Sequence, residues 1–394
     1  MKATGFAAVA LVAAGSGVAQ SFGRFTYGVL LPALRDELAI SNSVAGFIGT
    51  LNVGAYLLGT LAVAAATSRY KLLAVMRVGL VLSTLGLTLA AVALNPWLLG
   101  LSMLLAGFGG AFVWIPAPII AADSLPPERR RVAVGLMGSG IGIGIVFTGW
   151  LSGVVRSSFG DDAWRTVYAI EAAIGLATLV LTFVLIRHVQ DQPSGGRVGI
   201  GGFGSLQRMP GWLALTMAYT SFGLMYLLVI AFLTTRLEDD SGWTGSSASL
   251  AFTLVGLAVV FGGPLAVLLV GRIGSRTALA LAFISWSIIV VAILPGWPIL
   301  TFVASAGLGL MFAGIPGMIT LYVVENTLVE DYGPSFAAAT LAFGLAQTIA
   351  PQVGGVLADA TGSFTLVFLL SAALALTGTA ASLQLPRHVG TAAT

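Results

Sequence analysis

The sequence predicts an all-α membrane protein with twelve transmembrane helices arranged in two pseudo-symmetric six-helix bundles. Three observations lead to this fold class: an apolar composition, twelve apolar stretches of spanning length, and a repeat at an offset of 200 residues. Hydrophobic residues make up 57% of the 394 residues and charged residues only 8%, whereas soluble domains carry about 25% charged residues. The chain therefore has too little polar surface for an ordinary soluble domain.

The apolar stretches have the length of membrane-spanning helices. A helix that rises 1.5 Å per residue needs about 20 apolar residues to cross a hydrocarbon core of about 30 Å. Lipid cannot satisfy an unpaired strand edge, and the runs are too long and continuous for the strands of a barrel. The twelve stretches are approximately 5–31, 44–67, 73–94, 97–121, 132–155, 165–186, 211–235, 247–270, 277–294, 299–324, 335–357 and 364–385.

Two short sequences recur at the same distance. Residues 21–23 return at 221–223, and residues 107–119 align with residues 307–319, where six positions are identical. Composition alone would give roughly one match. The repeat predicts a duplicated half, with bundles at residues 1–187 and 211–387. The segment 188–210 is predicted to be a cytoplasmic linker because it is polar and rich in glycine, and residues 388–394 form a tail.

The distribution of basic residues predicts the orientation in the membrane. Thirteen of the eighteen Lys and Arg residues lie in loops or termini on one side, and only Arg35, Arg156, Arg165 and Arg236 lie on the other. Positively charged loops face the cytoplasm. We therefore expect both termini and the linker in the cytoplasm. The expected location is a bacterial inner membrane, and the protein is expected to be a monomer.

The residues available for chemistry argue against an enzyme. The chain has no cysteine, and its two histidines lie in the linker and the tail. No Ser/His/Asp set can be assembled at one membrane depth, and the linker glycines are not followed by the Lys-Ser/Thr of a phosphate-binding loop. We expect no catalytic residue, no metal, no cofactor and no nucleic-acid partner. The expected partners are a small-molecule substrate, protons and the lipid bilayer.

Arg24 is the strongest candidate for a binding residue. A charge within a spanning helix costs about 2.5–3.5 kcal/mol unless it faces protein or water. Gln20, Arg24 and Tyr27 follow the i, i+4, i+7 spacing that places them on one helical face. A guanidinium flanked by an amide and a phenol suits a carboxylate. The alternative is a structural anchor that is hydrogen-bonded to carbonyls or paired with an acid.

Other polar and aromatic residues within the spans are further candidates. Asn52 and Tyr56 share a face of the second helix, where Asn52 either lines the path or makes an interhelical hydrogen bond. Gln347 is the equivalent candidate in the eleventh helix. Trp114 stands where the second half has Gly314, and it either forms an aromatic wall of the path or packs against other helices.

Glu171 is the carboxylate that lies well inside a span, in the sixth helix. A buried carboxylate binds a proton more readily than an exposed one, which is the behaviour that a proton-coupled carrier needs. Glu171 is therefore the candidate for proton coupling. The alternative is a structural pairing with a neighbouring helix.

Together these features resemble the major facilitator superfamily over essentially the whole chain. The stretches 21–32, 41–46 and 52–59 are similar to the bacterial branch labelled YbfB/YjiJ-like. The glycine-rich residues 138–153 are similar to the glycine motif of the proton antiporters, without its usual proline. The resemblance implies an alternating-access carrier in which helices 1, 2, 4, 5, 7, 8, 10 and 11 surround a central cavity.

The resemblance also implies gating residues. The loop 271–276 is similar to the basic gating motif of the superfamily, and residues 67–71 resemble it more weakly; neither keeps the acidic residue of the motif. On this basis Arg69, Arg272 and Arg276 are the predicted gating residues.

The resulting functional hypothesis is a secondary transporter of a small organic anion, driven by the proton gradient. The alternative within transport is proton-driven efflux of amphipathic drugs or metabolites, which Arg24 disfavours. A membrane sensor that does not transport would need a soluble signalling domain, and none is apparent in the sequence.

Overall fold

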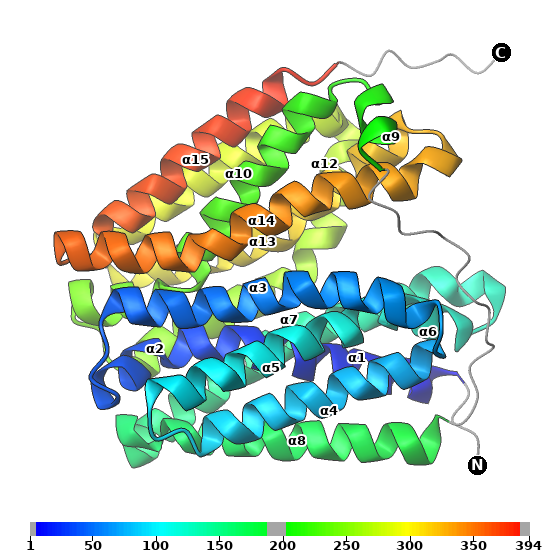
Figure 1. Cartoon of the computed structure of the whole chain (residues 1–394). Coiled ribbons are helices and arrows are strands. Elements are labelled where there is room, and N and C mark those ends of the chain that lie inside the picture. Colours follow the sequence, from blue (N-terminus) through cyan, green and yellow to red (C-terminus); the bar gives the residue numbers. More distant parts are fainter. Residues whose placement is uncertain (1–4, 187–201, 387–394) are drawn as a thin grey trace. The chain divides into compact units, whose positions relative to one another are not determined.

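The protein is built almost entirely from helices. The computed structural model describes residues 5–186 and 202–386, and it contains no strand within these ranges (Figure 1). Contacts divide the chain into two compact units. Unit 1 comprises residues 1–196, 230–257 and 351–365, and unit 2 comprises residues 197–229, 258–350 and 366–394.

Unit 1 contains the first six spans and two later stretches, residues 230–257 and 351–365. Several spans consist of two or three consecutive helical pieces. Its helices are α1 (Phe6–Ser16), η1 (Gly17–Phe25), α2 (Thr26–Glu37), α3 (Asn42–Thr67), α4 (Leu72–Ala91), α5 (Pro96–Trp114), α6 (Ala117–Asp123), η2 (Pro127–Arg129), α7 (Arg130–Phe159), η3 (Asp161–Ala163), α8 (Trp164–Leu185), α11 (Leu233–Thr235) and η4 (Arg236–Asp240).

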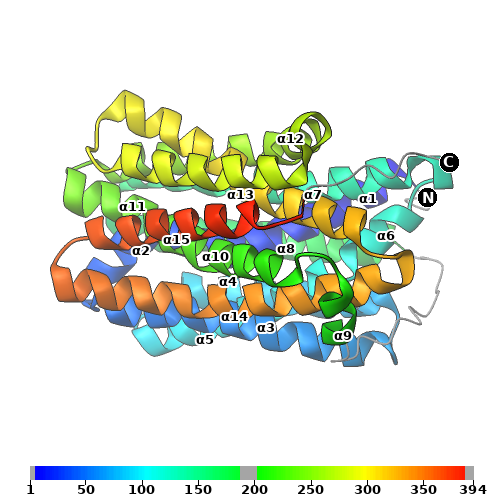
Figure 2. The ribbon, with the colours of Figure 1, turned by 90° about the horizontal axis from the view of Figure 1, so that it is seen from above.

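Unit 2 contains most of the later spans. Its helices are α9 (Gly202–Arg208), α10 (Trp212–Ile230, which ends at the boundary of unit 1), α13 (Pro298–Asn326) and α15 (Thr365–Leu383). Two long helices, α12 (Gly245–Ile293) and α14 (Val329–Thr361), contribute to both units. Within unit 2, α15 lies along α10, where the Ser371 hydroxyl donates to the Met225 carbonyl at 2.8 Å (Figure 2).

The twelve predicted spans are confirmed. Among the described residues, eleven helices are long and apolar enough to cross a membrane, and one of these, α12, has 49 residues. Gly274 interrupts α12 with φ 76° and ψ 156°, so this helix is two spans joined at a kink. A positive φ is a conformation that glycine adopts without the steric cost that a side chain imposes. Eleven helices with one counted twice give twelve spans.

Local sequence explains where several helices begin. The Ser41 hydroxyl accepts the backbone N–H of Val44 and caps α3, and the Asn95 side chain accepts the N–H of Leu98 and caps α5. Side-chain oxygens at this position satisfy donors that the first turn leaves unpaired. Pro96 follows as the first residue of α5, a position where proline needs no N–H.

Glycine allows the helices of unit 1 to approach closely. A Cβ on Gly107 of α5 would lie 2.0 Å from the Asn52 carbonyl oxygen of α3. A Cβ on Gly140 of α7 would lie 2.1 Å from the Ala13 carbonyl oxygen of α1, and one on Gly144 would lie 2.6 Å from the Ser21 side chain. Small residues permit this backbone approach between membrane helices. Part of the glycine-rich stretch 138–153 thus packs against the first span.

The division into bundles at residues 1–187 and 211–387 stays a prediction, because the compact units follow contacts rather than the repeat. Within the range predicted as a linker, residues 202–208 form α9. There the Arg208 guanidinium pairs with Asp331 at 2.6 Å, which ties α9 to α14. Residues 188–201 of the predicted linker and the tail 388–394 lie outside the described residues.

Candidate functional site

Arg24 lies in an unusual part of the first span. Residues Gly17–Phe25 form a π-helix, η1, between the α-helices α1 and α2. π-helical turns are rare, and they occur frequently at functional sites. The other eight residues of this segment are buried, whereas Arg24 itself is partly exposed. The segment therefore holds a charged side chain in an otherwise enclosed stretch of helix.

The Arg24 guanidinium has no acidic partner among the described residues. Its Nη2 atom is buried and donates no hydrogen bond within that part of the chain. Its Cζ atom lies 4.7 Å from the centre of the Tyr56 ring on α3. A guanidinium over an aromatic face is attracted by the ring quadrupole, but this attraction does not satisfy its N–H donors. The Nη2 donor of Arg24 therefore has no acceptor among the described residues, which is the state expected of an arginine that binds a ligand.

Gln20 and Tyr56 accompany Arg24. Gln20 is buried and donates from Nε2 to the Gly110 carbonyl of α5 at 3.1 Å, and its side chain lies close to Tyr56. Tyr56 is partly exposed and carries the Arg24 guanidinium on its ring. The predicted combination of a guanidinium, an amide and a phenol is therefore present, with Tyr56 supplying the phenol.

Tyr27 departs from the predicted arrangement. Its hydroxyl is buried and donates to the Ala45 carbonyl of α3 at 2.7 Å. The i, i+4, i+7 spacing assumed a regular α-helix, whereas a π-helical stretch with i→i+5 hydrogen bonds lies between Gln20 and Tyr27. The wider turn changes the face on which Tyr27 emerges. Tyr27 thus links two helices in this structure.

Asn52 makes the interhelical hydrogen bonds that were the alternative reading of the sequence. Its Nδ2 donates to the Gly23 carbonyl of η1 at 2.8 Å and to the Met103 carbonyl of α5 at 3.0 Å. Its side-chain oxygen is buried and accepts no hydrogen bond within the described residues. Asn52 therefore joins three helices directly beside Arg24, and a role in the transport path stays a prediction.

Trp114 and Gln347 lie in different units. Trp114 is the last residue of α5 in unit 1, is partly exposed, and directly precedes the break at residues 115–116. Gln347 lies on α14 in unit 2, where its buried side chain accepts the Tyr226 hydroxyl at 2.7 Å. Tyr226 in turn belongs to a group of stacked rings with Phe222, Phe312 and Phe343. Unit 2 thus contains a largely buried aromatic cluster with one amide.

Glu171 is fully buried and hydrogen-bonded to two threonines. The Thr26 hydroxyl of α2 lies 2.8 Å from Oε1 and 3.0 Å from Oε2, and the Thr148 hydroxyl of α7 lies 2.7 Å from Oε1. No ion pair within the described residues includes Glu171. The carboxyl therefore joins three helices without a cation, and its role in proton coupling stays a prediction.

The predicted gating arginines are on the surface. Arg69 and Arg272 are exposed, Arg276 is partly exposed, and none of them forms an ion pair within the described residues. A different arginine of unit 1, Arg130, lies 3.4 Å from Asp123 at the end of α6. The gating role of the three arginines stays a prediction.

Sequence reasoning missed a cluster of ion pairs in unit 1. Arg156 of α7 donates to both carboxylate oxygens of Glu238 at 2.7 Å and to Asp161 at 2.6 Å, and Arg35 of α2 pairs with Asp239. We call Arg35, Arg156, Glu238 and Asp239 the ion-pair cluster. Burial raises the pKa of Glu238, and the hydrogen bonds from Arg156 oppose this change.

The charge pattern contained a signal for this cluster. Arg35, Arg156, Arg165 and Arg236 are the basic residues that the topology prediction placed opposite the majority, together with several acids. In the structure each of the four pairs with an acid. Basic and acidic residues on the same predicted side of the membrane favour ion pairs between them, and the sequence contains both kinds there.

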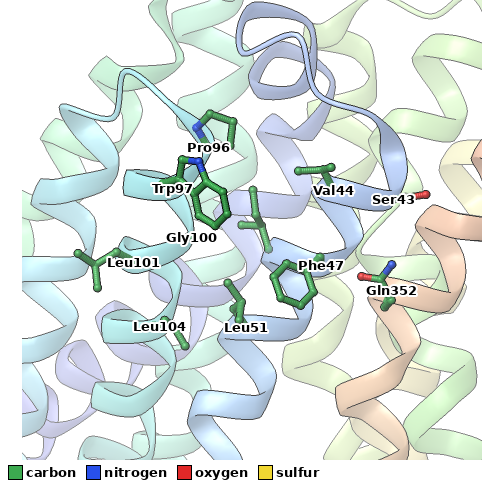
Figure 3. Close-up of a pocket in the computed structure, with 11 residues that line it drawn as sticks. Ser43, Val44, Phe47, Leu51, Pro96, Trp97, Gly100, Leu101, Leu104 and Gln352 are labelled. Atoms are coloured by element: carbon green, nitrogen blue, oxygen red, sulfur yellow. The ribbon is translucent and has the colours of Figure 1, made fainter.

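A pocket of about 670 Å³ opens on unit 1 away from Arg24. Figure 3 shows apolar side chains of α3 and α5, including Phe47, Leu51 and Trp97, around it. Ser43 and Gln352 are the polar residues of its lining. Trp97 is 86% exposed, and Phe47 is 50% exposed. The pocket can accommodate an apolar group, and it contains none of the predicted site residues.

Sequence comparison decides the family. A sequence profile described as "Uncharacterised MFS-type transporter YbfB" matches residues 16–383. The chain belongs to this family of major facilitator superfamily transporters. It is therefore a transporter and not an enzyme, and the resemblance seen in the sequence is confirmed.

Individual relatives agree with this assignment. The chain is 24% identical to "Uncharacterized MFS-type transporter YtbD" of Bacillus subtilis (strain 168) over 84% of each protein. It is 28% identical to "Monocarboxylate transporter 11" of Homo sapiens over 91% of this chain and 78% of the relative.

Solved structures share the fold. A bacterial homologue of the human lysosomal transporter Spinster, in an inward-facing and unoccupied conformation, has a TM-score of 0.76, with 16% identity, over 95% of this chain and 94% of that structure. A D-xylose-proton symporter has a TM-score of 0.75, with 15% identity, over 95% of this chain and 96% of that structure. At these identities the likeness establishes the fold of this family member.

Proposed function

We propose that this transporter moves a small organic anion across the membrane by alternating access, driven by protons. The observation that carries the proposal is the state of Arg24. Its guanidinium lies within a spanning helix, has no carboxylate partner among the described residues, and retains a buried N–H without an acceptor. A carboxylate would satisfy that donor and neutralise the charge, which is costly within a membrane.

The surroundings of Arg24 support an anion rather than a neutral solute. Gln20 and Tyr56 lie beside the guanidinium, and a planar fork flanked by an amide and a phenol can orient a carboxylate. The human relative at 28% identity is named a monocarboxylate transporter. We also propose that the protein is a monomer in a bacterial inner membrane. Both termini are proposed to be cytoplasmic, because the basic residues follow the positive-inside rule.

A second candidate is proton-driven efflux of amphipathic compounds. The apolar pocket of about 670 Å³ favours it, since exposed apolar side chains on α3 and α5 could receive a hydrophobic group from the bilayer. This candidate assigns no ligand to Arg24. The two proposals therefore differ in the charge of the ligand and in the residues that bind it.

A thermal-shift screen of the purified protein separates the two proposals. A ligand that binds only the folded state stabilises it by about 2.7 kcal/mol at 100 times its dissociation constant. We expect small monocarboxylates to raise the melting temperature in a concentration-dependent manner, with sugars as the neutral control. Stabilisation by cationic amphipaths but not by carboxylates would contradict the anion proposal and favour efflux.

Proton coupling has its own measurement. In proteoliposomes that contain a pH-sensitive dye, addition of the stabilising ligand to one side should move protons together with or against it. A ligand flux without any change in internal pH would contradict proton coupling, while leaving the anion proposal intact.

A further inference from the structure

Three oxygen-bearing side chains from three helices meet in a closed triangle inside unit 1. Glu171 of α8 is 0% exposed. Thr26 of α2 and Thr148 of α7 both contact its carboxyl group, and their two hydroxyl oxygens lie 3.0 Å from each other. All three distances are those of hydrogen bonds between oxygen atoms. Each side of the triangle therefore needs one proton.

The number of available protons depends on the charge of Glu171. An ionised carboxylate brings none, so the two threonine hydroxyls supply two protons for three contacts. Both hydroxyls would then donate to Glu171, and their oxygens would face each other at 3.0 Å without a proton between them. A neutral carboxyl supplies the third proton. Its Oε2 donates to Thr26, Thr26 donates to Thr148, and Thr148 donates to Oε1, which closes the ring.

The electrostatic surroundings also favour the neutral form. A buried carboxylate requires a nearby cation, and no described ion pair includes Glu171. Helix α1 carries no charged residue, and the single charged residue of α4, Arg77, donates to the Thr182 and Ile186 carbonyls at the far end of α8. The Arg24 guanidinium on η1 lies over Tyr56.

The remaining ionisable groups around the ring are tyrosines and helix-end residues. The Tyr168 hydroxyl, on the same helix as Glu171, is buried and has no hydrogen-bond partner within the described residues, and the Tyr27 hydroxyl donates to Ala45. The charged residues of the packed helices α2, η3, α7 and α8 lie toward their ends, and they are Arg35, Asp36, Glu37, Arg130, Arg131, Arg156, Asp161, Asp162 and Arg165.

We propose that Glu171 is the proton-binding site of the transporter and that it holds its proton in a closed hydrogen-bond ring with Thr26 and Thr148. The proposal rests on the proton-driven transport proposed above, and it adds the identity of the site and the two residues that complete it. Release of the proton to water leaves Thr26 and Thr148 without a hydrogen bond between them. This hydrogen bond between α2 and α7 is then lost.

The position of the ring gives this loss a mechanical consequence. Thr26 and Arg35 are nine residues apart on α2, and Thr148 and Arg156 are eight residues apart on α7, which corresponds to about 13 Å and about 12 Å along each helix. The ring therefore lies at a similar distance from both arginines of the ion-pair cluster. Protonation of Glu171 therefore adds a hydrogen bond between the two helices that present these arginines to Glu238 and Asp239.

Infrared spectroscopy of the purified full-length protein detects the proton directly, without a substrate. A neutral carboxyl group has a C=O stretching band that a carboxylate lacks. We expect this band at neutral pH in the wild-type protein, its loss in Glu171→Gln, and its retention in the control Glu325→Gln, which changes an exposed carboxylate. Absence of the band in the wild-type protein, or its persistence in Glu171→Gln, would overturn the proposal.

Glu171→Gln is expected to fold, because an amide can replace the neutral carboxyl in the ring. Its N–H donates to Thr26 and its oxygen accepts from Thr148, so the melting temperature should remain close to that of the wild-type protein. Glu171→Ala leaves both hydroxyls without this partner and should lower the melting temperature. Equal stability of the two variants would contradict the ring.

Thr148→Val tests the ring separately from the proton. The carbonyl oxygen of Glu171 then loses a hydrogen bond, and its stretching band should shift to higher frequency. The matched control is Thr182→Val, because Thr182 is equally buried on α8 but its hydroxyl bonds only to the Leu179 carbonyl of its own helix. A band that stays at its wild-type frequency in Thr148→Val would show that Thr148 does not complete the ring.

These outcomes are distinguishable from failure of the anion proposal. If carboxylates do not bind but the infrared band behaves as expected, the proton site stands and the substrate class is wrong. If carboxylates bind and are transported with protons in Glu171→Gln, the proton site is wrong and the anion proposal stands. Loss of proton-driven uptake in Glu171→Gln, with ligand exchange retained, supports both proposals.

Discussion

Two of the arginines in unit 1 that lie in largely buried surroundings, Arg156 and Arg24, have opposite environments. The Arg156 side chain is 1% exposed and is bound by two carboxylates, with Glu238 accepting from both terminal nitrogens at 2.7 Å. Arg24 has an aromatic ring beneath it, and its buried Nη2 has no acceptor among the described residues. Arg156 is therefore satisfied by the protein itself, whereas Arg24 is incompletely satisfied.

From this difference we infer that Arg156 is a structural charge and that Arg24 is a functional one. Leaving a buried charged donor unpaired costs free energy, so a fold that merely needed a positive charge at Arg24 would provide an acid, as it does for Arg156. The nearby polar residue Asn52, one turn before Tyr56 on α3, is an amide and not an acid. Its Nδ2 donates to backbone carbonyls. The comparison predicts that Arg156 contributes to stability and Arg24 to binding.

The largest expected effect on stability is that of Arg156→Ala. It leaves Glu238 buried without its partner, and breaking a buried ion pair in this way costs about 3–5 kcal/mol of folding free energy. The measurement is unfolding of the purified protein, by heat or denaturant. The matched control is Arg208→Ala, because the Arg208–Asp331 pair is more exposed and exposed pairs contribute about 0–1 kcal/mol.

The double variant Arg156→Ala, Glu238→Gln should recover part of this loss, because the carboxylate that it leaves unpaired, Asp161, is exposed to solvent. If Arg156→Ala unfolds like the wild-type protein, the ion-pair cluster is not structural and the comparison with Arg24 fails.

Arg24→Ala should have the opposite profile. Removal of a donor without an acceptor leaves stability unchanged or slightly raised, whereas loss of the charged partner weakens anion binding by about 2–5 kcal/mol, roughly 30-fold or more. The thermal shift produced by carboxylates should therefore disappear. Arg77→Ala is the matched control, since Arg77 donates to the Thr182 and Ile186 carbonyls and should affect stability but not binding. Normal carboxylate binding by Arg24→Ala would reverse the assignment.

The sequence predicted the spans well, because the length of an apolar run is a local property that the bilayer constrains. All twelve predicted stretches have a helical counterpart. Two of them form the single helix α12, which is kinked at Gly274. The sequence also singled out Arg24, since an intramembrane arginine requires an explanation wherever it occurs, but it left open whether the protein itself pairs the guanidinium.

Contacts between distant residues were not predictable in the same way. The π-helical turns of η1 coincide with close packing, where a Cβ on Gly17 would lie 2.9 Å from the Gly140 carbonyl oxygen. No local periodicity reports such an approach, so Tyr27 was assigned to the face of Arg24. Likewise Thr26 and Thr148 lie 145 and 23 residues from Glu171. Only the fold brings them into one triangle.

Gly245→Ala is expected to have an intermediate effect on the ion-pair cluster. A Cβ at Gly245, the first residue of α12, would lie 2.1 Å from the Arg156 Cζ atom, so the guanidinium has to move away from Glu238. Overpacking of this kind costs about 1–3 kcal/mol. Gly263→Ala on the same helix is the control, because a Cβ there meets nothing within 4 Å. Equal melting temperatures of the two variants would show that Arg156 has room that the structure does not indicate.

Arg24→Lys should have the smallest effect, and it tests the geometry of the binding charge. Lysine keeps the positive charge but loses the planar fork that binds a carboxylate with two hydrogen bonds and stacks on Tyr56. We expect the carboxylate affinity of Arg24→Lys to be about tenfold, or about 1.4 kcal/mol, below that of the wild-type protein, and still above that of Arg24→Ala. The measurement is the dissociation constant of one carboxylate for the three proteins by calorimetry. Wild-type affinity in Arg24→Lys would show that charge alone is sufficient, and an affinity as low as that of Arg24→Ala would show that the fork is indispensable. Either result would contradict our expectation that the positive charge of Arg24 contributes most of the carboxylate-binding free energy and the planar fork contributes the rest.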